Sequence, residues 1–192
     1  MKINYLIVGQ GLAGTCLAHQ LFDRNQSFKI IQNDKLPSSS KVAGGMINPL
    51  TGKRLARTWK HEIIFDYLDE FYTYLEDKLN TKLLYKTQLF RPYKNENQKH
   101  QFEKAIELKR LNELIDDVSA ESAKSDIIEA PLGGLMTHQC GRLDMNSFLD
   151  SSKAFFKESG YYLEGNFENN SIISNPNLIN YQSFEFRKVI FC

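Results

Sequence analysis

The sequence predicts an α/β fold built on a parallel sheet. An apolar, strand-forming run ends at Gly9, a glycine-rich turn follows, and a helix with apolar residues at helical spacing continues to about Arg24. Asn25, which tolerates the left-handed conformation, is expected to end this helix. A second apolar run covers residues 28–32, and a third covers residues 189–192, as expected for buried parallel strands. Strand, glycine turn and helix in this order favour a Rossmann-like nucleotide-binding domain.

The turn matches the dinucleotide fingerprint Gly9-x-Gly11-x-x-Gly14. Gly9 makes the tight turn, Gly11 lets the backbone approach a pyrophosphate, and Gly14 lets the helix pack closely on the strand. The free N–H groups at the start of the helix, at Leu12 and Ala13, would bind the pyrophosphate. Glycines also serve turns without a ligand, but the strand before them and the helix after them favour a binding site.

The second strand ends at Gln32, about 20 residues beyond the glycines, where the fingerprint usually has an acidic residue that binds the ribose hydroxyls. An amide oxygen accepts such a hydrogen bond more weakly than a carboxylate, because it carries no charge. The sequence therefore leaves two interpretations open: Gln32 binds the ribose, or it only ends the strand.

Residues 36–54 are rich in serine, glycine and proline and predict a loop. Its serines and Lys41 can bind phosphate oxygens, and Gly44-Gly45 would let a flat ring lie against the main chain. A surface loop with two turns is the simpler alternative.

The glycine turn, Ser38-Ser39-Ser40-Lys41-Val42-Ala43-Gly44-Gly45 and Asn48-Pro49-Leu50-Thr51-Gly52-Lys53-Arg54 together resemble the N-terminal part of FAD-dependent oxidoreductases of the D-amino-acid oxidase and glycine oxidase superfamily. The resemblance implies FAD as the cofactor. It also places a set of residues at the flavin end: Ser39, Ser40, Ala43, Gly44 and Met46. It implies further that Asn166-Phe167 meets the adenine, and that Lys53 or Arg54 supplies positive charge near reduced flavin.

The middle of the chain alternates helix and strand patterns. Residues 59–79 predict a helix with an aromatic stripe buried in the core and an acidic, solvated face. Two short strands are expected within residues 82–93, an exposed helix at 96–115, and a polar connection after it. Arg91, a possible carboxylate clamp, is more typical of a structural residue.

A strand is expected within residues 131–144, and Asp144 suits the N-cap of a helix that ends at Gly160. In the family, a step such as Gly141-Arg142-Leu143-Asp144 returns the chain to the nucleotide domain. His138 on this strand could transfer protons, but a packed histidine is the more frequent case. Short strands and a turn at 175–177 complete the pattern.

The resemblance divides the chain into three segments: residues 1–58 form the first half of the FAD-binding domain, 59–143 belong to an α+β substrate or cap domain, and 144–192 return to the FAD-binding domain. A buried strand at 189–192 needs further chain to cover it. We therefore expect an N-terminal piece, about half of a family member, that is poorly soluble alone.

The implied function is oxidation of an amine or amino acid by hydride transfer to flavin N5, and no catalytic residue is predicted. One alternative is an NAD(P)-dependent dehydrogenase or reductase with the same fingerprint. That class predicts a crossover helix and a third strand within about 30 residues of the second. The other alternative is a non-redox module that binds FAD structurally or acts through a partner.

Composition limits the possible partners and location. The 192 residues carry a net charge of +1, which predicts no nucleic-acid partner, and no apolar run approaches the ~20 residues of a membrane span. Cys16, Cys140 and Cys192 are scattered without metal-ligand spacing, so we expect free thiols, no metal site and a cytoplasmic location.

Overall fold

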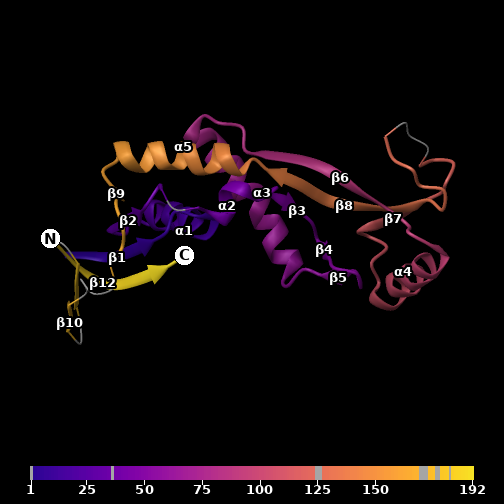
Figure 1. Cartoon of the computed structure of the whole chain (residues 1–192), viewed down its shortest axis with the longest axis horizontal. Coiled ribbons are helices and arrows are strands. Elements are labelled where there is room, and N and C mark those ends of the chain that lie inside the picture. Colours follow the sequence, from indigo (N-terminus) through magenta and orange to yellow (C-terminus); the bar gives the residue numbers. More distant parts are fainter. Residues whose placement is uncertain (1, 36, 124–126, 169–172, 176–177, 182) are drawn as a thin grey trace. The chain divides into compact units, whose positions relative to one another are not determined.

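The computed structural model describes residues 2–35, 37–123, 127–168, 173–175, 178–181 and 183–192. The chain divides into two compact units (Figure 1). Unit 1 comprises Met1–Ala43, Leu79–Thr81 and Met145–Cys192, and unit 2 comprises Gly44–Lys78 and Lys82–Asp144. Residues 44–58 thus pack within unit 2, and the functional assignment of the three predicted segments stays a prediction.

Unit 1 is an α/β unit with a six-stranded sheet in the order β10-β11-β12-β1-β2-β9. The central strand β1 pairs in parallel with both β12 and β2, and β2 pairs in parallel with β9. The elements of this unit are β1 (Lys2–Val8), α1 (Leu12–Asp23), β2 (Phe28–Gln32), α2 (Ser39–Val42), α5 (Met145–Glu158), β9 (Tyr162–Glu164), β10 (Ile173–Asn175), β11 (Leu178–Tyr181) and β12 (Phe184–Phe191). The predicted parallel sheet is confirmed.

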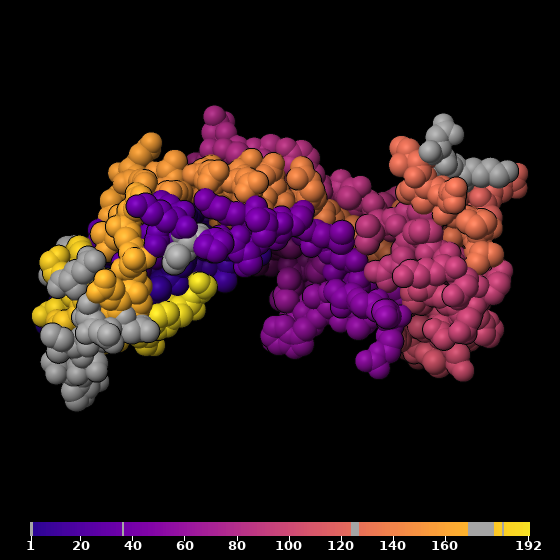
Figure 2. Space-filling model, viewed as in Figure 1, coloured from indigo at the N-terminus to yellow at the C-terminus, as the bar shows by residue number. Residues whose placement is uncertain are grey.

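The core of unit 1 forms because the inner strands are apolar on both faces. Leu6, Ile7 and Ile30 are fully buried. Ile7 and Ile30 form one cluster with Ala18 of α1 and Phe156 of α5, while Leu6 belongs to a second cluster. In Figure 2 the orange surface of α5 lies against the indigo and violet surface of the N-terminal segment within this unit. Burial of these apolar side chains holds the strands and helices together.

The ends of both long helices of unit 1 follow the sequence prediction. After α1 the chain turns at Asn25, whose φ of 53° lies in the left-handed region, and after α5 it turns at Gly160 with a φ of 73°. Asparagine and glycine tolerate this conformation better than other residues.

The predicted burial of the last strand is wrong in part. β12 is parallel to β1, but Phe191 is 63% exposed. Phe191 lies at the end of β12, where it lines a cavity instead of packing under another layer. β11 pairs only with residues 184–186 of β12, so the described chain places no strand along the outer edge of residues 189–191. The predicted turn at 175–177 includes Pro176 and Asn177, which lie outside the described residues.

Unit 2 is an α+β unit in which the long strand β8 pairs antiparallel with β6 on one side and with β3 and β7 on the other. Its elements are β3 (Met46–Ile47), β4 (Leu50–Thr51), β5 (Ala56–Arg57), α3 (His61–Leu79), β6 (Leu84–Pro92), α4 (Glu96–Lys109), β7 (Ile115–Val118) and β8 (Gly134–Leu143). A separate core gathers Leu50, Tyr93, Phe102 and Leu114.

Glu76 near the end of α3 holds the start of β6. Its Oε1 accepts hydrogen bonds from the main-chain N–H groups of Leu83 (2.8 Å) and Leu84 (2.7 Å), and its Oε2 accepts one from Lys82 Nζ (2.8 Å). Partial burial raises the pKa of this carboxyl group, but the Lys82 ammonium and the two N–H donors outweigh burial and lower it overall. The ionised carboxylate therefore stabilises the turn.

Four local predictions in unit 2 and the adjoining loop are wrong. The predicted loop at 36–54 contains the short helix α2 and strands β3 and β4. The two strands expected within residues 82–93 form one strand, β6, with an irregularity between Thr87 and Leu89. Residues 115–118, where a polar connection was expected, form β7. The predicted aromatic stripe is only partly buried, because Trp59, which precedes α3, is 74% exposed and Ile63 is 67% exposed. The buried residues of α3 are His61, Phe71, Tyr72 and Leu75.

None of the helices among the described residues combines the length and apolar character that a membrane span requires.

Candidate dinucleotide-binding site

The turn between β1 and α1 is so tightly packed that only glycine fits at two of its positions. Gly9 has a φ of +107°, and a Cβ atom there would lie 2.3 Å from the main-chain oxygen of Cys192. A Cβ atom on Gly14 would lie 2.1 Å from the carbonyl oxygen of Gly9. The turn is anchored to its neighbours, since Gly9 N–H donates to Ile31 O (2.9 Å) and Cys192 N–H donates to Val8 O (2.9 Å).

The N-terminus of α1 carries the features of an anion site. Gly11 is the extended N-cap residue and provides no side-chain cap, and the first turn contains no acidic residue. The N–H of Leu12 donates to Ser40 Oγ at 3.0 Å, which brings the hydroxyl of α2 to the start of α1. Ser40 still has a proton to donate, and N–H groups of a helix start attract anions.

A cavity of about 560 Å³ lies at the carboxyl ends of β1, β2 and β12. It is lined by residues 8–9, 31–33, 165–167 and 191–192, and none of these described residues carries an ionised side chain. Phe167 stacks on Tyr181 (ring centroids 4.8 Å apart) and meets Phe191 edge to face (5.3 Å). In open α/β sheets, ligands bind at this end of the strands, where the strand order reverses.

Gln32 lies in this cavity with both ends of its amide bonded to the main chain. Its Oε1 accepts from Gln10 N–H (2.7 Å), and its Nε2 donates to Asn33 O (2.8 Å). The side-chain amides of Asn33 and Asn166 hydrogen-bond each other at the same rim. Gln32 therefore does more than end β2, because its side chain hydrogen-bonds the main chain of both Gln10 and Asn33.

The acidic residue closest to Gln32 in this segment, Asp34, is engaged elsewhere. Its carboxylate accepts from Lys153 Nζ (2.5 Å) and from the hydroxyl of Tyr162 (3.2 Å). Partial burial raises the pKa of Asp34, but the Lys153 ammonium and the Tyr162 hydroxyl outweigh burial and lower it. Burial and this carboxylate raise the pKa of Tyr162.

The structure brings together most of the predicted cofactor residues but not all. Gly9, Gln32 and Phe167 line the cavity, and Gly11, Leu12, Ala13, Gly14 and Ser40 form or contact the start of α1. Ser39 and Ala43 are exposed on or beside α2, while Gly44 and Met46 are exposed residues of unit 2.

Sequence reasoning missed Gln10, Asn33 and the contribution of Cys192. Gln10 is buried, and its Nε2 donates to Leu149 O at 2.8 Å. Asn33 follows Gln32 directly, so the sequence could have predicted that it lies close to the site. The contacts of Gln10 and Cys192 join residues far apart in the chain, and no local pattern predicts them.

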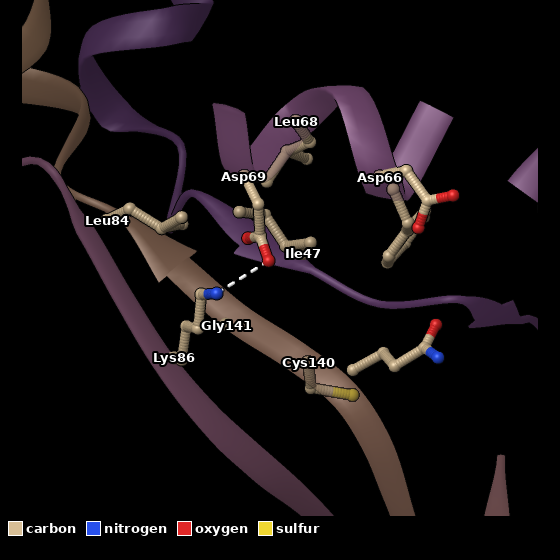
Figure 3. A pocket seen from close by; sticks show the side chains of 10 residues that line it. Ile47, Asp66, Leu68, Asp69, Leu84, Lys86, Cys140 and Gly141 are labelled. Carbon is tan, nitrogen blue, oxygen red and sulfur yellow. Dashed lines mark hydrogen bonds and ion pairs between the residues drawn. The ribbon is translucent and has the colours of Figure 1, made fainter. Parts of the chain in front are cut away.

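Unit 2 has its own cavity of about 290 Å³ between α3 and strands β6 and β8 (Figure 3). Asp69 reaches from α3 toward Lys86 on β6, with 2.5 Å between Oδ2 and Nζ. Gln139 adopts a left-handed φ of 54° and bonds His61 Nε2 (2.8 Å), and burial raises the pKa of the Cys140 thiol.

His138 and Arg91, which the sequence left open as chemical groups, both have protein partners in unit 2. The ring nitrogens of His138 lie 2.8 Å from Asp116 Oδ2 and 3.0 Å from Gln88 Nε2. Arg91 donates to the main-chain oxygen of Gly52 (3.2 Å). These contacts fit structural roles.

No family model matches the chain. Among solved structures, the glycine oxidase from Geobacillus kaustophilus matches all of this chain over 55% of its own length, with a TM-score of 0.74 and 15% identity. The L-α-glycerophosphate oxidase from Mycoplasma pneumoniae, solved with FAD bound, matches 98% of this chain over 53% of its own (0.70, 16%). The L-amino acid deaminase from Proteus myxofaciens, in complex with anthranilate, matches all of this chain over 45% of its own (0.74, 13%).

These likenesses show the fold. The predicted fold class, an α/β unit with a parallel sheet plus an α+β unit, is therefore confirmed by the structure and by its likeness to these solved structures. The chain spans about half the length of the proteins that it matches.

Proposed function

We propose that this chain is the FAD-binding part of a flavin-dependent oxidoreductase that acts on an amine or amino acid. The carrying observation is the glycine turn Gly9–Gly14, packed so closely that no Cβ fits at either end, beside a cavity at the ends of three parallel strands. The same fold holds FAD in the glycerophosphate oxidase. The names of the glycine oxidase and the amino acid deaminase support an amino-acid or amine substrate.

The residues present fit the cofactor. The start of α1 and the Ser40 hydroxyl offer donors to the pyrophosphate, and the cavity with Gln32 and Phe167 takes the adenosine end. By the family resemblance, a further set contacts the flavin: Ser39, Ala43, Gly44 and Met46. Flavin, when bound, accepts a hydride from the carbon beside the amine, and the protein orients substrate and cofactor.

The course of the chain supports FAD over a nicotinamide cofactor. Among the described residues, the segment after β2 forms only the four-residue helix α2 before the chain leaves unit 1, and the next strand of this sheet is β9 at Tyr162–Glu164. The nicotinamide alternative predicts a crossover helix and a third strand within about 30 residues. A non-redox module remains the second alternative.

The proposal also covers the kind of molecule that the protein binds and its location in the cell. A net charge of +1 supports a small-molecule substrate rather than nucleic acid, and three scattered cysteines support a cytoplasmic location.

The test is the visible spectrum of the protein purified without added cofactor, with the released chromophore identified after denaturation. We expect FAD, or tight uptake of added FAD measured by quenching of flavin fluorescence. Gly11→Asp should abolish uptake, because it places a carboxylate at the pyrophosphate position. Ala154→Asp, which adds the same charge at an exposed position of α5, should leave uptake unchanged.

Two results would contradict the proposal. Binding of NAD or NADP without FAD would establish a nicotinamide protein. A colourless protein that takes up none of the three would leave the turn as a structural feature of an interaction module.

A further inference from the structure

We propose that the cavity of unit 2 binds a small primary amine, whose ammonium group meets Asp66 and the side-chain oxygen of Gln139 while its hydrocarbon part packs on the apolar wall. The inference goes beyond the proposed function, because every residue that lines this cavity belongs to unit 2 and binding there needs no flavin. It gives the protein a small-molecule site whose residues are separate from those of the dinucleotide site.

The cavity has room for a small organic molecule and an apolar wall to hold it. Its volume is about 290 Å³, and it lies between α3 and the strands β6 and β8 (Figure 3). Phe65 and Leu68 line it from α3, Ile47 from β3 and Leu84 from β6. Binding pockets for small ligands combine such an apolar wall with a few polar groups that fix the orientation of the ligand.

The charged side chains that line the cavity favour a cation. Asp66 and Asp69 lie about one helical turn apart on α3, and Lys86 on β6 pairs with Asp69, with 2.5 Å between Nζ and Oδ2 (Figure 3). The described residues offer Asp66 no basic partner. Burial raises the pKa of the Cys140 thiol, so this group stays protonated at neutral pH and adds no charge. Two carboxylates against one ammonium leave the lining with a net charge of −1, which attracts an amine.

A bulge in β8 brings Gln139 into the lining of the cavity. Between Thr137 and Cys140, which pair with β6, two residues of β8 face only one residue of β6. Gln139 is one of the two, and its φ of 54° lies in the left-handed region that residues other than glycine rarely adopt. Bulges of this kind change the direction of a side chain and are frequent beside functional sites. Here the bulge places a polar side chain opposite the carboxylates of α3.

His61 fixes the amide group of Gln139. The histidine is only 5% exposed, its Nε2 lies 2.8 Å from Gln139 Oε1, and its ring packs on Phe65 with the centroids 4.7 Å apart. Gln139 Oε1 is the sole hydrogen-bond partner of this ring within the described part of the chain, since Nδ1 is buried without one. An amide oxygen has two lone pairs, so Oε1 can accept the Nε2 proton and keep one lone pair for a ligand.

These groups offer an ammonium group acceptors on both sides of the cavity. The Asp66 carboxylate comes from α3 and Gln139 Oε1 comes from β8, and an ammonium group has three hydrogens to donate. Its hydrogen bond to the carboxylate is stronger than that of a neutral hydroxyl group, because both partners are charged. The cavity therefore distinguishes an amine from an alcohol of the same shape.

The test is an NMR titration of the full chain, without cofactor, with isobutylamine and with isobutanol, which has the same carbon skeleton but no charge. We expect saturable shifts of the backbone amide signals of residues 139–141 with the amine, and a dissociation constant about tenfold larger for the alcohol. Equal affinity for the two molecules, or shifts confined to residues that do not line the cavity, would overturn the proposal.

Two variants test the polar groups, and a third is the control. Asp66→Asn, at an exposed position of α3, should remove most of the preference for the amine. Gln139→Gly suits the left-handed φ and removes the side-chain oxygen, so it should fold and bind the amine at least about threefold more weakly. Glu70→Gln removes the same charge from an exposed position that does not line the cavity, and should change nothing. Amine binding that is unchanged in either cavity variant, or equally weakened in Glu70→Gln, contradicts the site.

The titration separates this inference from the proposed function. A chain that binds isobutylamine as described but takes up no FAD contradicts the proposed function alone. A chain that takes up FAD but binds isobutanol as tightly as isobutylamine contradicts this inference alone.

Discussion

Replacing Gly14 by alanine tests whether α1 packs on β1 as closely as the structure shows. The added Cβ atom would lie 2.1 Å from the carbonyl oxygen of Gly9 and 3.2 Å from Cβ of Cys192. The first distance is far below 3.4 Å, where ordinary van der Waals contact begins. Both obstacles belong to the sheet side of the turn, so the helix must move away from the sheet.

Two opposing effects determine how much Gly14→Ala lowers the free energy of unfolding. Overpacking against main-chain atoms costs about 3 kcal/mol, the upper part of the usual range, because the Gly9 carbonyl cannot rotate away as a side chain would. Alanine is the better helix former by about 1 kcal/mol. The net loss of about 2 kcal/mol lowers the melting temperature by roughly 4–8 °C for a chain of this size.

The assay is thermal unfolding of the cofactor-free protein, followed by circular dichroism. Gly11→Ala is the matched control, because its Cβ would meet only the side chain of Ser40, with the hydroxyl at 3.1 Å, and this side chain can turn aside. We expect a shift of about 2 °C or less for the control. A Gly14→Ala protein that melts at or above the wild-type temperature would refute the close packing of helix on strand.

Two further variants test polar contacts by chemical denaturation. Glu76→Ala leaves two main-chain N–H groups without their acceptor and should lower the free energy of unfolding by about 1–3 kcal/mol. Glu76→Gln keeps an acceptor oxygen and should lower it less. An equally large decrease in the control Glu70→Ala, at an exposed position of α3, would contradict the role of Glu76 as this acceptor. Asp34→Asn should cost about 1 kcal/mol at neutral pH. Because pairing with Lys153 lowers the pKa of Asp34, this difference should persist above pH 3.8, the ordinary value, and shrink as the pH falls through the lower folded-state pKa; a pH-independent difference would argue against the ion pair.

The sequence by itself determined the local elements of the nucleotide-binding unit. The spacing of Gly9, Gly11 and Gly14 predicted the turn, and the predicted strand at 28–32 coincides with β2. Helix ends at Asn25 and Gly160 were also predicted correctly. These features are local: apolar periodicity sets the element, and residues that tolerate a positive φ end it.

Tertiary structure alone decided which side chains meet at the site. Gln32 is joined to Gln10, Ser40 to Leu12, and Gln10 to Leu149 across 22, 28 and 139 residues of the chain. Tertiary packing also decided that Trp59 and Ile63 are exposed, although their spacing suited a buried stripe. Periodicity shows that a helix has an apolar face, but burial of that face depends on what packs against it, and hydrogen-bond partners depend on how the strands and helices are brought together.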